Sequence, residues 1–308
     1  MLRSVKIPKP LVSGDKIVIV SPASIIDPAL VDGAVAALAA QGWNPWVAPH
    51  ALGVNGTMSG SRAERLADMR AALSDADTKA IMCARGGYGA VHLLADLDDA
   101  LASMQEPKWL IGFSDISALH GLWHKHGMAS VHGSMARHLA LFPADDAPNK
   151  ALLELLHHGI MPHLQWSTEL NYNRPGSATG TLMGGNLAVL SGLIASPYSL
   201  LLPDTILFIE DIAESIYKVE RMLYQLRLSG VLANLRGLVV GRFTDYRPDP
   251  NHPQGMESMI AKMIEPYHYP VAFNAPIGHV PENMPVIEGA NVAFDVDTYG
   301  ASITYIDN

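Results

Sequence analysis

Residues 109–116 are Trp-Leu-Ile-Gly-Phe-Ser-Asp-Ile, a short apolar run that stops at a serine and an aspartate. A run of this length bounded by turn residues is typical of a buried strand. The pattern from Ile116 to His126, which ends at Gly127, predicts a helix. Apolar runs followed by helical patterns recur at Lys16–Val20 and Ala80–Ala84. Alternating strands and helices predict a parallel sheet covered on both faces.

Two further helices are predicted between these strands. Ala29–Ala40 is rich in alanine and stops before Gly42. Ser61 and Glu64 have the spacing of a capping box, so a second helix is expected to begin there. In a sheet of this kind the ligand crevice lies beyond the carboxyl ends of the strands.

The second half of the chain changes character. Pro162–Pro175 is polar and aperiodic and is interpreted as a connection between domains. The segments after it favour strands, with one long helix that ends at Gly230; the expected elements are the strands Thr205–Ile209, Gly237–Val240, Asn291–Val296 and Ser302–Ile306 and the helix Glu214–Ser229. We therefore expect an N-terminal α/β domain over residues 1–165 and a smaller, β-rich C-terminal α/β domain over residues 176–308.

Composition and charge exclude several classes of protein. With 308 residues, 49% hydrophobic and 17% charged, the chain is not intrinsically disordered. Its 21 basic and 30 acidic side chains give a formal charge of −9 without any basic run. This argues against nucleic acid or an anionic membrane as a partner. The single cysteine, Cys83, rules out an intrachain disulfide and a multi-cysteine metal site.

The N-terminal residues are basic, but no apolar segment follows them, so no secretory signal is expected. No apolar stretch reaches the roughly 18 residues of a membrane-spanning helix. A cytoplasmic protein is therefore expected. The helix that carries His120, His124 and His126 could suggest a metal, but a surface helix edge is the simpler interpretation. Neither a metal nor a cofactor is expected.

Two turns after strands could carry chemistry. Arg85-Gly86-Gly87-Tyr88-Gly89 follows one strand, and its glycines would let the backbone approach a ligand closely. Ser114 and Asp115 follow another, at a strand-to-helix turn of the kind that exposes a serine oxygen near backbone N–H groups. The simpler interpretations are a tight turn and a helix cap.

An acid and a histidine complete a catalytic combination. Glu210 and Asp211 are expected directly after a strand, and His279 lies in a proline-bounded loop. A serine hydroxyl needs a base, and the base needs an acid to fix its tautomer. Ser114, His279 and Glu210 supply one of each. Helix capping by the acids and a structural histidine are the alternatives.

These residues belong to a set of motifs that, in this order, resembles the LD-carboxypeptidases, the serine peptidase family that contains muramoyltetrapeptide carboxypeptidase. The motifs are Ala84–Ala90 (ARGGYGA), Gly112–Asp115 (GFSD), Gly180–Leu187 (GTLMGGNL), Leu207–Asp211 (LFIED), Val219–Leu223 (VERML) and Gly278–His279. They extend over most of the chain. Phe113 departs from the pattern, because many relatives carry Tyr or His before the serine.

The resemblance implies a Ser–His–Glu triad at Ser114, His279 and Glu210. It also implies an oxyanion hole formed by the N–H of Asp115 and a glycine N–H, that of Gly87 or Gly86. Arg85 is a candidate for the substrate carboxylate. The family fold is an N-terminal α/β sandwich and a smaller β-rich C-terminal domain with the site between them.

The implied activity is hydrolysis of the bond between the L-centre of a diamino acid and D-alanine in murein tetrapeptides. The implied setting is peptidoglycan recycling in the cytoplasm, by a homodimer. Which diamino acid is preferred, and whether the peptide is free or linked to sugar or nucleotide, stays open. A subset of the family instead confers immunity by cleaving aminoacyl-adenylate antibiotics, for which Trp166 or Tyr246 would have to stack on a base. A non-catalytic peptide or sugar sensor is the alternative outside the hydrolases.

Overall fold

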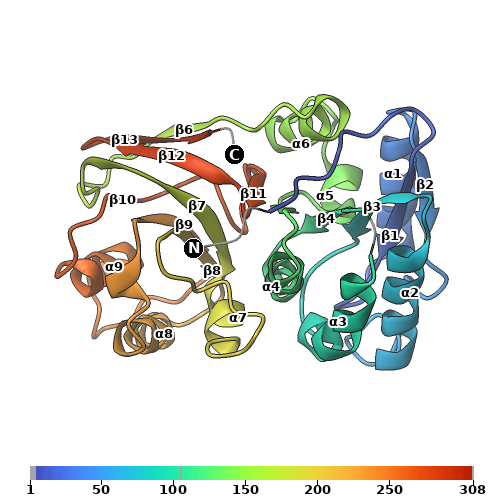
Figure 1. Cartoon of the computed structure of the whole chain (residues 1–308). Coiled ribbons are helices and arrows are strands. Elements are labelled where there is room, and N and C mark those ends of the chain that lie inside the picture. Colours follow the sequence, from blue (N-terminus) through green and yellow to red (C-terminus); the bar gives the residue numbers. More distant parts are fainter. Residues whose placement is uncertain (1–4, 105, 307–308) are drawn as a thin grey trace. The chain divides into compact units, whose positions relative to one another are not determined.

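The computed structural model describes residues 5–104 and 106–306, and the chain divides into two compact units (Figure 1). Unit 1 comprises Met1–Pro162 and Met284–Glu288, and unit 2 comprises His163–Asn283 and Gly289–Asn308. Each unit has its own β-sheet with helices packed on it. The predicted class, a parallel α/β sheet followed by a second α/β unit, is confirmed.

The sheet of unit 1 has the strand order β11-β5-β4-β3-β1-β2. Its neighbours are parallel except β11, which runs antiparallel to β5. Strand β11, which follows most of unit 2 in the chain, was not predicted from the sequence. The strands are β1 (Lys16–Val20), β2 (Asn44–Val47), β3 (Thr78–Cys83), β4 (Trp109–Gly112), β5 (Ser130–His132) and β11 (Val286–Glu288).

Helices cover both faces of this sheet. They are α1 (Pro28–Ala39), α2 (Arg62–Ser74), α3 (Leu94–Ala102), α4 (Ser117–Lys125), α5 (Ala136–Leu141) and α6 (Ala147–His158), with short 3₁₀ turns at Ala90–Leu93 and Ser114–Ile116. The chain moves from β1 outward to β2 and then back across β1 to β3. Right-handed crossovers therefore place α1 on one face and α2 to α4 on the other. The contacts of α1 with α5, and of α3 with α2 and α4, agree.

The reversal in the direction of strand addition marks the expected ligand crevice of unit 1. The strand order switches direction between β1 and β3. In open α/β sheets the crevice lies at such a switch, beyond the carboxyl ends of the strands. The loop after β1 and the glycine turn after β3 meet there, because Ser24 N donates to the Gly86 carbonyl over 3.4 Å. The serine turn follows β4, the next strand along.

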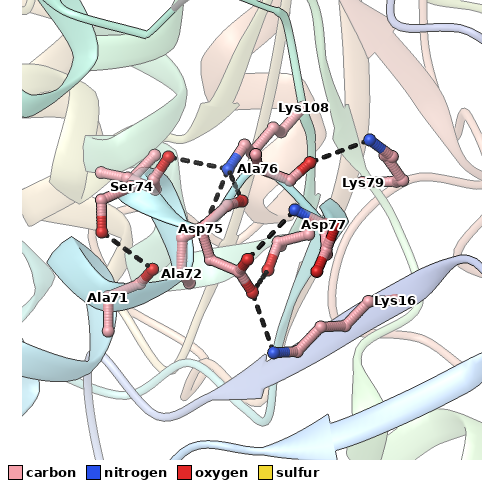
Figure 2. Close-up of polar contacts among 11 residues, drawn as sticks. Lys16, Ala71, Ala72, Ser74, Asp75, Ala76, Asp77, Lys79 and Lys108 are labelled. Atoms are coloured by element: carbon pink, nitrogen blue, oxygen red, sulfur yellow. Dashed lines mark hydrogen bonds and ion pairs between the residues drawn. The ribbon is translucent and has the colours of Figure 1, made fainter.

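Helix α2 has a defined cap at each end. The expected capping box between Ser61 and Glu64 is present at its start. At the other end, the buried Lys108 ammonium donates to the carbonyls of Ala72, Leu73 and Asp75 over 3.0, 2.7 and 2.6 Å. Figure 2 shows this ammonium among the carbonyl oxygens at the end of the helix. A single side chain thus satisfies helix-end carbonyls that lack partners within the helix.

The sheet of unit 2 has the order β10-β9-β8-β7-β12-β13-β6. From β7 to β10 the strands are parallel, and from β7 to β6 they are antiparallel. They are β6 (Leu164–Ser167), β7 (Gly176–Asn186), β8 (Thr205–Ile212), β9 (Gly237–Thr244), β10 (Val271–Ala272), β12 (Asn291–Val296) and β13 (Gly300–Tyr305). The interpretation of Pro162–Pro175 as a mere connection is wrong in part, because β6 within it pairs with β13.

The helices of unit 2 are α7 (Leu187–Gly192), α8 (Ile216–Leu228) and α9 (Gly255–Ile264), with a 3₁₀ turn at Leu232–Asn234. Each of the three follows a strand of the parallel part, and successive strands always step in the same direction. Right-handed crossovers therefore stack them on one face. Apolar side chains from strands and helices, including Leu207, Leu223 and Ile260, form the core between them. The predicted helix from Glu214 begins at Ile216 instead.

Among the described residues, none of the helices combines the length and the apolar composition needed to cross a membrane.

Candidate active site

The turn after β4 holds Ser114 in an unusual backbone conformation. Its φ is +66°, in the left-handed region that residues other than glycine seldom occupy. Such strain costs on the order of 1 kcal/mol or more and persists only where the surroundings enforce it. The extended strand ends at Gly112, and the 3₁₀ turn starts at Ser114 itself. The sharp strand-to-helix turn predicted here is therefore confirmed, and it resembles the strained turns that present nucleophiles.

The glycine turn after β3 packs directly on this serine. A Cβ added to Gly86 would lie 2.8 Å from Cβ and 2.9 Å from Oγ of Ser114, so only glycine fits. A Cβ on Gly87 would lie 2.1 Å from Oγ of Ser24, and that hydroxyl accepts a hydrogen bond from Tyr88 N over 3.2 Å. The turn is thus held between two serines. Which glycine N–H serves an oxyanion stays a prediction.

Arg85 is the first residue of this turn, and its guanidinium donates a hydrogen bond to a backbone carbonyl. Nη1 donates to the Ile25 oxygen over 3.1 Å, in the loop after β1. A guanidinium has five N–H donors, so this bond leaves others for a ligand. The expected contact of Arg85 with a substrate carboxylate stays a prediction.

His120 lies beneath the serine turn, buried rather than on a surface edge. Burial lowers its pKa to about 4, so the ring is neutral at pH 7. The neutral ring donates one N–H: Nε2 lies 2.9 Å from the Gly112 carbonyl, and Nδ1 lies 2.8 Å from the Ser130 hydroxyl, which donates to it. His124 is half-buried, and this partial burial lowers its pKa. The surface-edge interpretation is wrong for His120, which is fully buried, whereas His124 and His126 are partly exposed.

One cluster in the described part of the chain has metal-ligand chemistry. Donor atoms of His120, His132 and Glu288 lie within 4.8 Å of one another, and all three residues are buried. Both ring nitrogens of His120 already lie on Gly112 and Ser130. A metal would have to displace the Ser130 hydroxyl to bind there. We therefore interpret His120 as a hydrogen-bonded part of the core that links Ser130 of β5 to Gly112 at the serine turn.

In unit 2, the buried Glu210 forms a pair with the partly buried His279. The glutamate has no exposed surface, and its Oε2 lies 2.7 Å from Nδ1 of His279. The expectation that Glu210 follows its strand is wrong, since β8 continues to Ile212. The pairing of β8 with β9 is interrupted by a bulge at Glu210, between Ile209 and Asp211, while on its other side Glu210 still pairs with Asn186 of β7. Bulges commonly redirect a side chain in this way.

The histidine loop is anchored on both sides of His279. Ala275 N donates to Val240 O over 3.1 Å, and Arg242 N donates to Ile277 O over 2.9 Å. Gly278 N donates to the side chain of the buried Asn283 over 2.8 Å. The first two bonds tie the loop to β9, and the third joins the two sides of the loop around His279. Asn283 was not singled out from the sequence, where a lone amide in a loop gives no signal.

The two acids beside this histidine have different roles. Burial lowers the pKa of His279, but the hydrogen bond and charge of Glu210, with the charges of Asp211 and Asp245, outweigh it and leave the pKa above its usual value. Asp211 caps α7, accepting from Ala188 N and from the Asn186 amide over 2.9 Å each. Burial and the nearby charge of Glu210 raise the pKa of Asp211 to about 6.

The fold thus assembles the predicted site residues in two groups. Unit 1 brings together Arg85, Gly86, Gly87, Ser114 and Asp115, and unit 2 brings together Glu210 and His279.

Comparison with protein families gives the identity of both units. Residues 17–133 match the model of the LD-carboxypeptidase N-terminal domain, and residues 179–294 match that of the LD-carboxypeptidase C-terminal domain. A probable murein peptide carboxypeptidase of Bacillus subtilis is 32% identical over 94% of this chain and 91% of its own length. The chain belongs to the LD-carboxypeptidase family. It is therefore a peptidase, and the resemblance stated from the motifs is confirmed.

Other relatives of this LD-carboxypeptidase carry related names. The murein tetrapeptide carboxypeptidase of Pseudomonas aeruginosa is 30% identical over 87% of this chain and 89% of its own. Among solved structures, muramoyltetrapeptide carboxypeptidase from Oxalobacter formigenes has a TM-score of 0.84 at 24% identity, covering 95% of this chain and 99% of that one. The self-immunity protein MccF, in complex with aspartyl sulfamoyl adenosine, has a TM-score of 0.82 at 23% identity, covering 96% and 98%. These two structures share the fold.

Proposed function

We propose that this protein is a serine LD-carboxypeptidase that removes the terminal D-alanine from murein tetrapeptides. Ser114 is the nucleophile, His279 the general base and Glu210 the acid that orients it. The observation that carries the proposal is the 2.7 Å contact of the fully buried Glu210 with Nδ1 of His279. A buried carboxylate on Nδ1–H fixes the tautomer whose lone pair is on Nε2, which is the arrangement a serine base requires. The murein substrate is supported by the names of the relatives.

The proposed reaction runs through an acyl-enzyme. Nε2 of His279 takes the proton of Ser114 Oγ as the oxygen attacks the carbonyl carbon of the L-diamino acid. The imidazolium then gives that proton to the departing nitrogen of D-alanine as the C–N bond breaks. Water, deprotonated by the same nitrogen, attacks the ester and releases the shortened peptide. The charge of Glu210 stabilises the imidazolium in both steps.

Backbone donors on unit 1 are proposed to hold the developing oxyanion. They are the N–H of Asp115 and that of Gly87, with Gly86 as the other candidate glycine. Each such donor is worth about 3 kcal/mol of transition-state stabilisation in comparable sites. The strained φ of Ser114 and the contact of Gly86 with it support this assignment. Arg85 is proposed to bind the terminal carboxylate of the substrate.

Mass spectrometry of L-Ala-γ-D-Glu-meso-diaminopimelate-D-Ala incubated with the protein tests the proposal. The wild type should release one alanine, and Ser114→Ala should release none. Ser74→Ala, which changes a serine whose hydroxyl only bonds the Ala71 carbonyl at the end of α2, is the matched control and should retain full activity. Release of alanine by Ser114→Ala would reject the nucleophile. No release by wild type would reject the murein substrate.

If the tetrapeptide is not cleaved, an aminoacyl sulfamoyl adenosine is the next substrate to test. The fold likeness to MccF supports that choice. The two aromatic candidates for a base platform are only partly accessible. The Trp166 indole N–H is bonded to the Phe273 carbonyl over 2.9 Å, and Tyr246 packs against the core of unit 2. The murein proposal therefore stands first.

The proposed setting is the cytoplasm, and the proposed assembly is a homodimer. The buried, unpaired Cys83 fits a reducing compartment. Helix α8 presents Tyr217, Tyr224 and Leu228 to solvent, with exposures of 47, 46 and 84%. Their spacing places them on one face, which is a candidate dimer surface. Light scattering after size-exclusion chromatography should give twice 33.1 kDa, and Leu228→Glu should shift it toward the monomer.

A further inference from the structure

The side chain of Arg65 connects the loop after β1 with the glycine turn after β3, at the carboxyl edge of the unit 1 sheet. It lies in the first turns of α2 and is only 2% exposed. Its Nη1 donates to the Pro22 carbonyl, after β1, over 2.5 Å and to the Gly89 carbonyl, at the end of the glycine turn, over 2.9 Å. A Cβ on Gly89 would lie 2.8 Å from this nitrogen, so the guanidinium reaches the turn only because glycine stands there.

The side chain of Asp115 reaches the same turn from the other direction. Its carboxylate is 5% exposed, and Oδ2 accepts a hydrogen bond from Ala90 N over 2.8 Å. Asp115 directly follows Ser114, so this bond connects the nucleophile turn to the end of the glycine turn. Burial raises the pKa of the carboxyl, while the Ala90 bond and the charges of His92 and Arg65 oppose that rise. The buried cation and the buried anion thus attract each other through the turn they share.

Both turns need such restraint. Gly87 and Gly89 have φ of +119° and +122°, and Ser114 has φ of +66°. The serine conformation is costly and persists only where its neighbours hold it, and glycine, which has wide conformational freedom, keeps one conformation only where contacts fix it. An oxyanion donor acts only when it lies about 2.7–3.1 Å from the point where charge develops, so small shifts of either turn remove the benefit.

We propose that the Arg65 guanidinium and the Asp115 carboxylate are positioning groups that hold the glycine turn and the nucleophile turn in register and thereby form the oxyanion hole. The inference rests on the proposed function, because it assigns the hole to N–H groups of these two turns. It adds a role for two side chains, whereas the proposed function uses only the main-chain N–H of Asp115.

The test compares Arg65→Met and Asp115→Ala, which retain the main-chain donors, with Arg70→Met. Arg70 is the matched control because it lies on the same helix and donates to a single backbone oxygen, that of Asp96. Two rates are measured: kcat on the tetrapeptide, and labelling of Ser114 by a fluorophosphonate. In the labelling reaction the serine oxygen displaces fluoride, and the phosphoryl oxygen occupies the oxyanion hole.

In Arg65→Met and in Asp115→Ala, kcat and the labelling rate should each fall about 100-fold, while KM should stay within about threefold of the wild-type value. Arg65→Lys and Asp115→Asn, which keep a donor and an acceptor, should recover part of both rates. The double variant should be no slower than the slower single variant, because the two groups act as one unit. Arg70→Met should change neither rate.

The inference would be overturned if folded Arg65→Met and Asp115→Ala kept kcat and the labelling rate within threefold of wild type. It would also be overturned if these variants raised KM about 100-fold and left kcat and the labelling rate unchanged. Unfolding temperatures identify variants that fail to fold. If Arg65→Met or Asp115→Ala does not fold, the kcat and labelling rates of Arg65→Lys and Asp115→Asn test the inference instead. If the wild type is labelled at Ser114 but does not cleave the tetrapeptide, only the murein substrate is refuted. The labelling rates of the variants then still test the positioning role of Arg65 and Asp115. If the wild type is neither labelled nor active, both the assignment of Ser114 as nucleophile and the positioning role of Arg65 and Asp115 are refuted.

Discussion

The carboxylate of Glu210, which has no surface exposed to solvent, lies 2.7 Å from Nδ1 of His279 at a bulge in the β8–β9 ladder. Glu210 still pairs with Asn186 of β7, but the bulge breaks its pairing with β9, and its side chain contacts a loop residue from inside a strand. A carboxylate desolvated to this extent depends on its hydrogen-bond partner. The pair is therefore sensitive to any change in either member.

Glu210→Gln should shift the pH profile of kcat/KM. The pKa of His279 is raised chiefly by the bond and charge of Glu210 against the lowering effect of burial. Since the base works only when neutral, kcat/KM of the wild type should rise with pH through this raised pKa. In the variant the midpoint should move to lower pH, and the plateau should fall about 10³-fold because the tautomer is no longer fixed.

Asp245→Asn is the control for this profile. Asp245 affects His279 through charge, and its φ of +56° suits asparagine. The midpoint should move slightly in the same direction with the plateau unchanged. An unaltered midpoint in Glu210→Gln would contradict the assigned electrostatics. The raised pKa also means that His279 stabilises the fold at pH values below 6.5, and that this contribution is lost as pH rises through the folded pKa.

Gly86→Ala should impair catalysis more than folding. The added methyl group would lie 2.8 Å from Cβ of Ser114 and 2.9 Å from its Oγ, so the serine must move. A displacement of this kind costs about 100-fold in kcat. Gly192→Ala, where nothing lies within 4 Å of the added methyl group and φ is not positive, is the control and should leave kcat unchanged. Steady-state kinetics with both variants checks this, and a fully active Gly86→Ala would mean that Ser114 Oγ is not the reacting atom.

Lys108→Met should destabilise unit 1 without affecting the chemistry. The change leaves three backbone carbonyls without their donor at the end of α2 (Figure 2). Burial lowers the pKa of Lys108 to about 8, so removing the charge offsets part of the loss. We expect a net decrease of about 2 kcal/mol in the free energy of unfolding in urea.

The neighbouring Lys79 provides the comparison, because its ammonium donates to a single carbonyl, that of Ala76. Lys79→Met should change stability by less than about 0.5 kcal/mol. Equal effects of the two substitutions would show that the three bonds of Lys108 contribute nothing beyond ordinary surface contacts.

Asp211→Asn should remove a pH dependence of stability. Burial and the charge of Glu210 raise the pKa of Asp211 from 3.8 to about 6. A raised folded pKa gives a contribution that is complete below the unfolded pKa and is lost as pH rises through 6. Between pH 4 and 6.5 the wild type should therefore lose about 2 kcal/mol relative to the variant. Parallel urea titrations check this, and identical slopes in the two proteins would reject the shifted pKa.

Local sequence determined the elements and the chemistry they could carry. The runs at residues 16–20 and 109–113 became strands β1 and β4, and the Ser61–Glu64 spacing became a capping box, because these features depend on neighbours in the chain. The glycine turn and the serine turn were recognisable for the same reason. The family was recognisable from short motifs, most of which lie at the end of a strand or in the loop beside it, while Val219–Leu223 lies in α8.

Tertiary structure alone decided the rest. Strand β11 comes from residues 286–288 yet pairs with β5, and Arg65 reaches the Gly89 carbonyl through a fold in which those residues are 24 apart. The extension of β8 past Ile209, with its bulge, required pairing with β9. His120 became buried because α4 packs on the sheet. Such contacts join distant segments, and their energies depend on burial and partners that no local pattern contains.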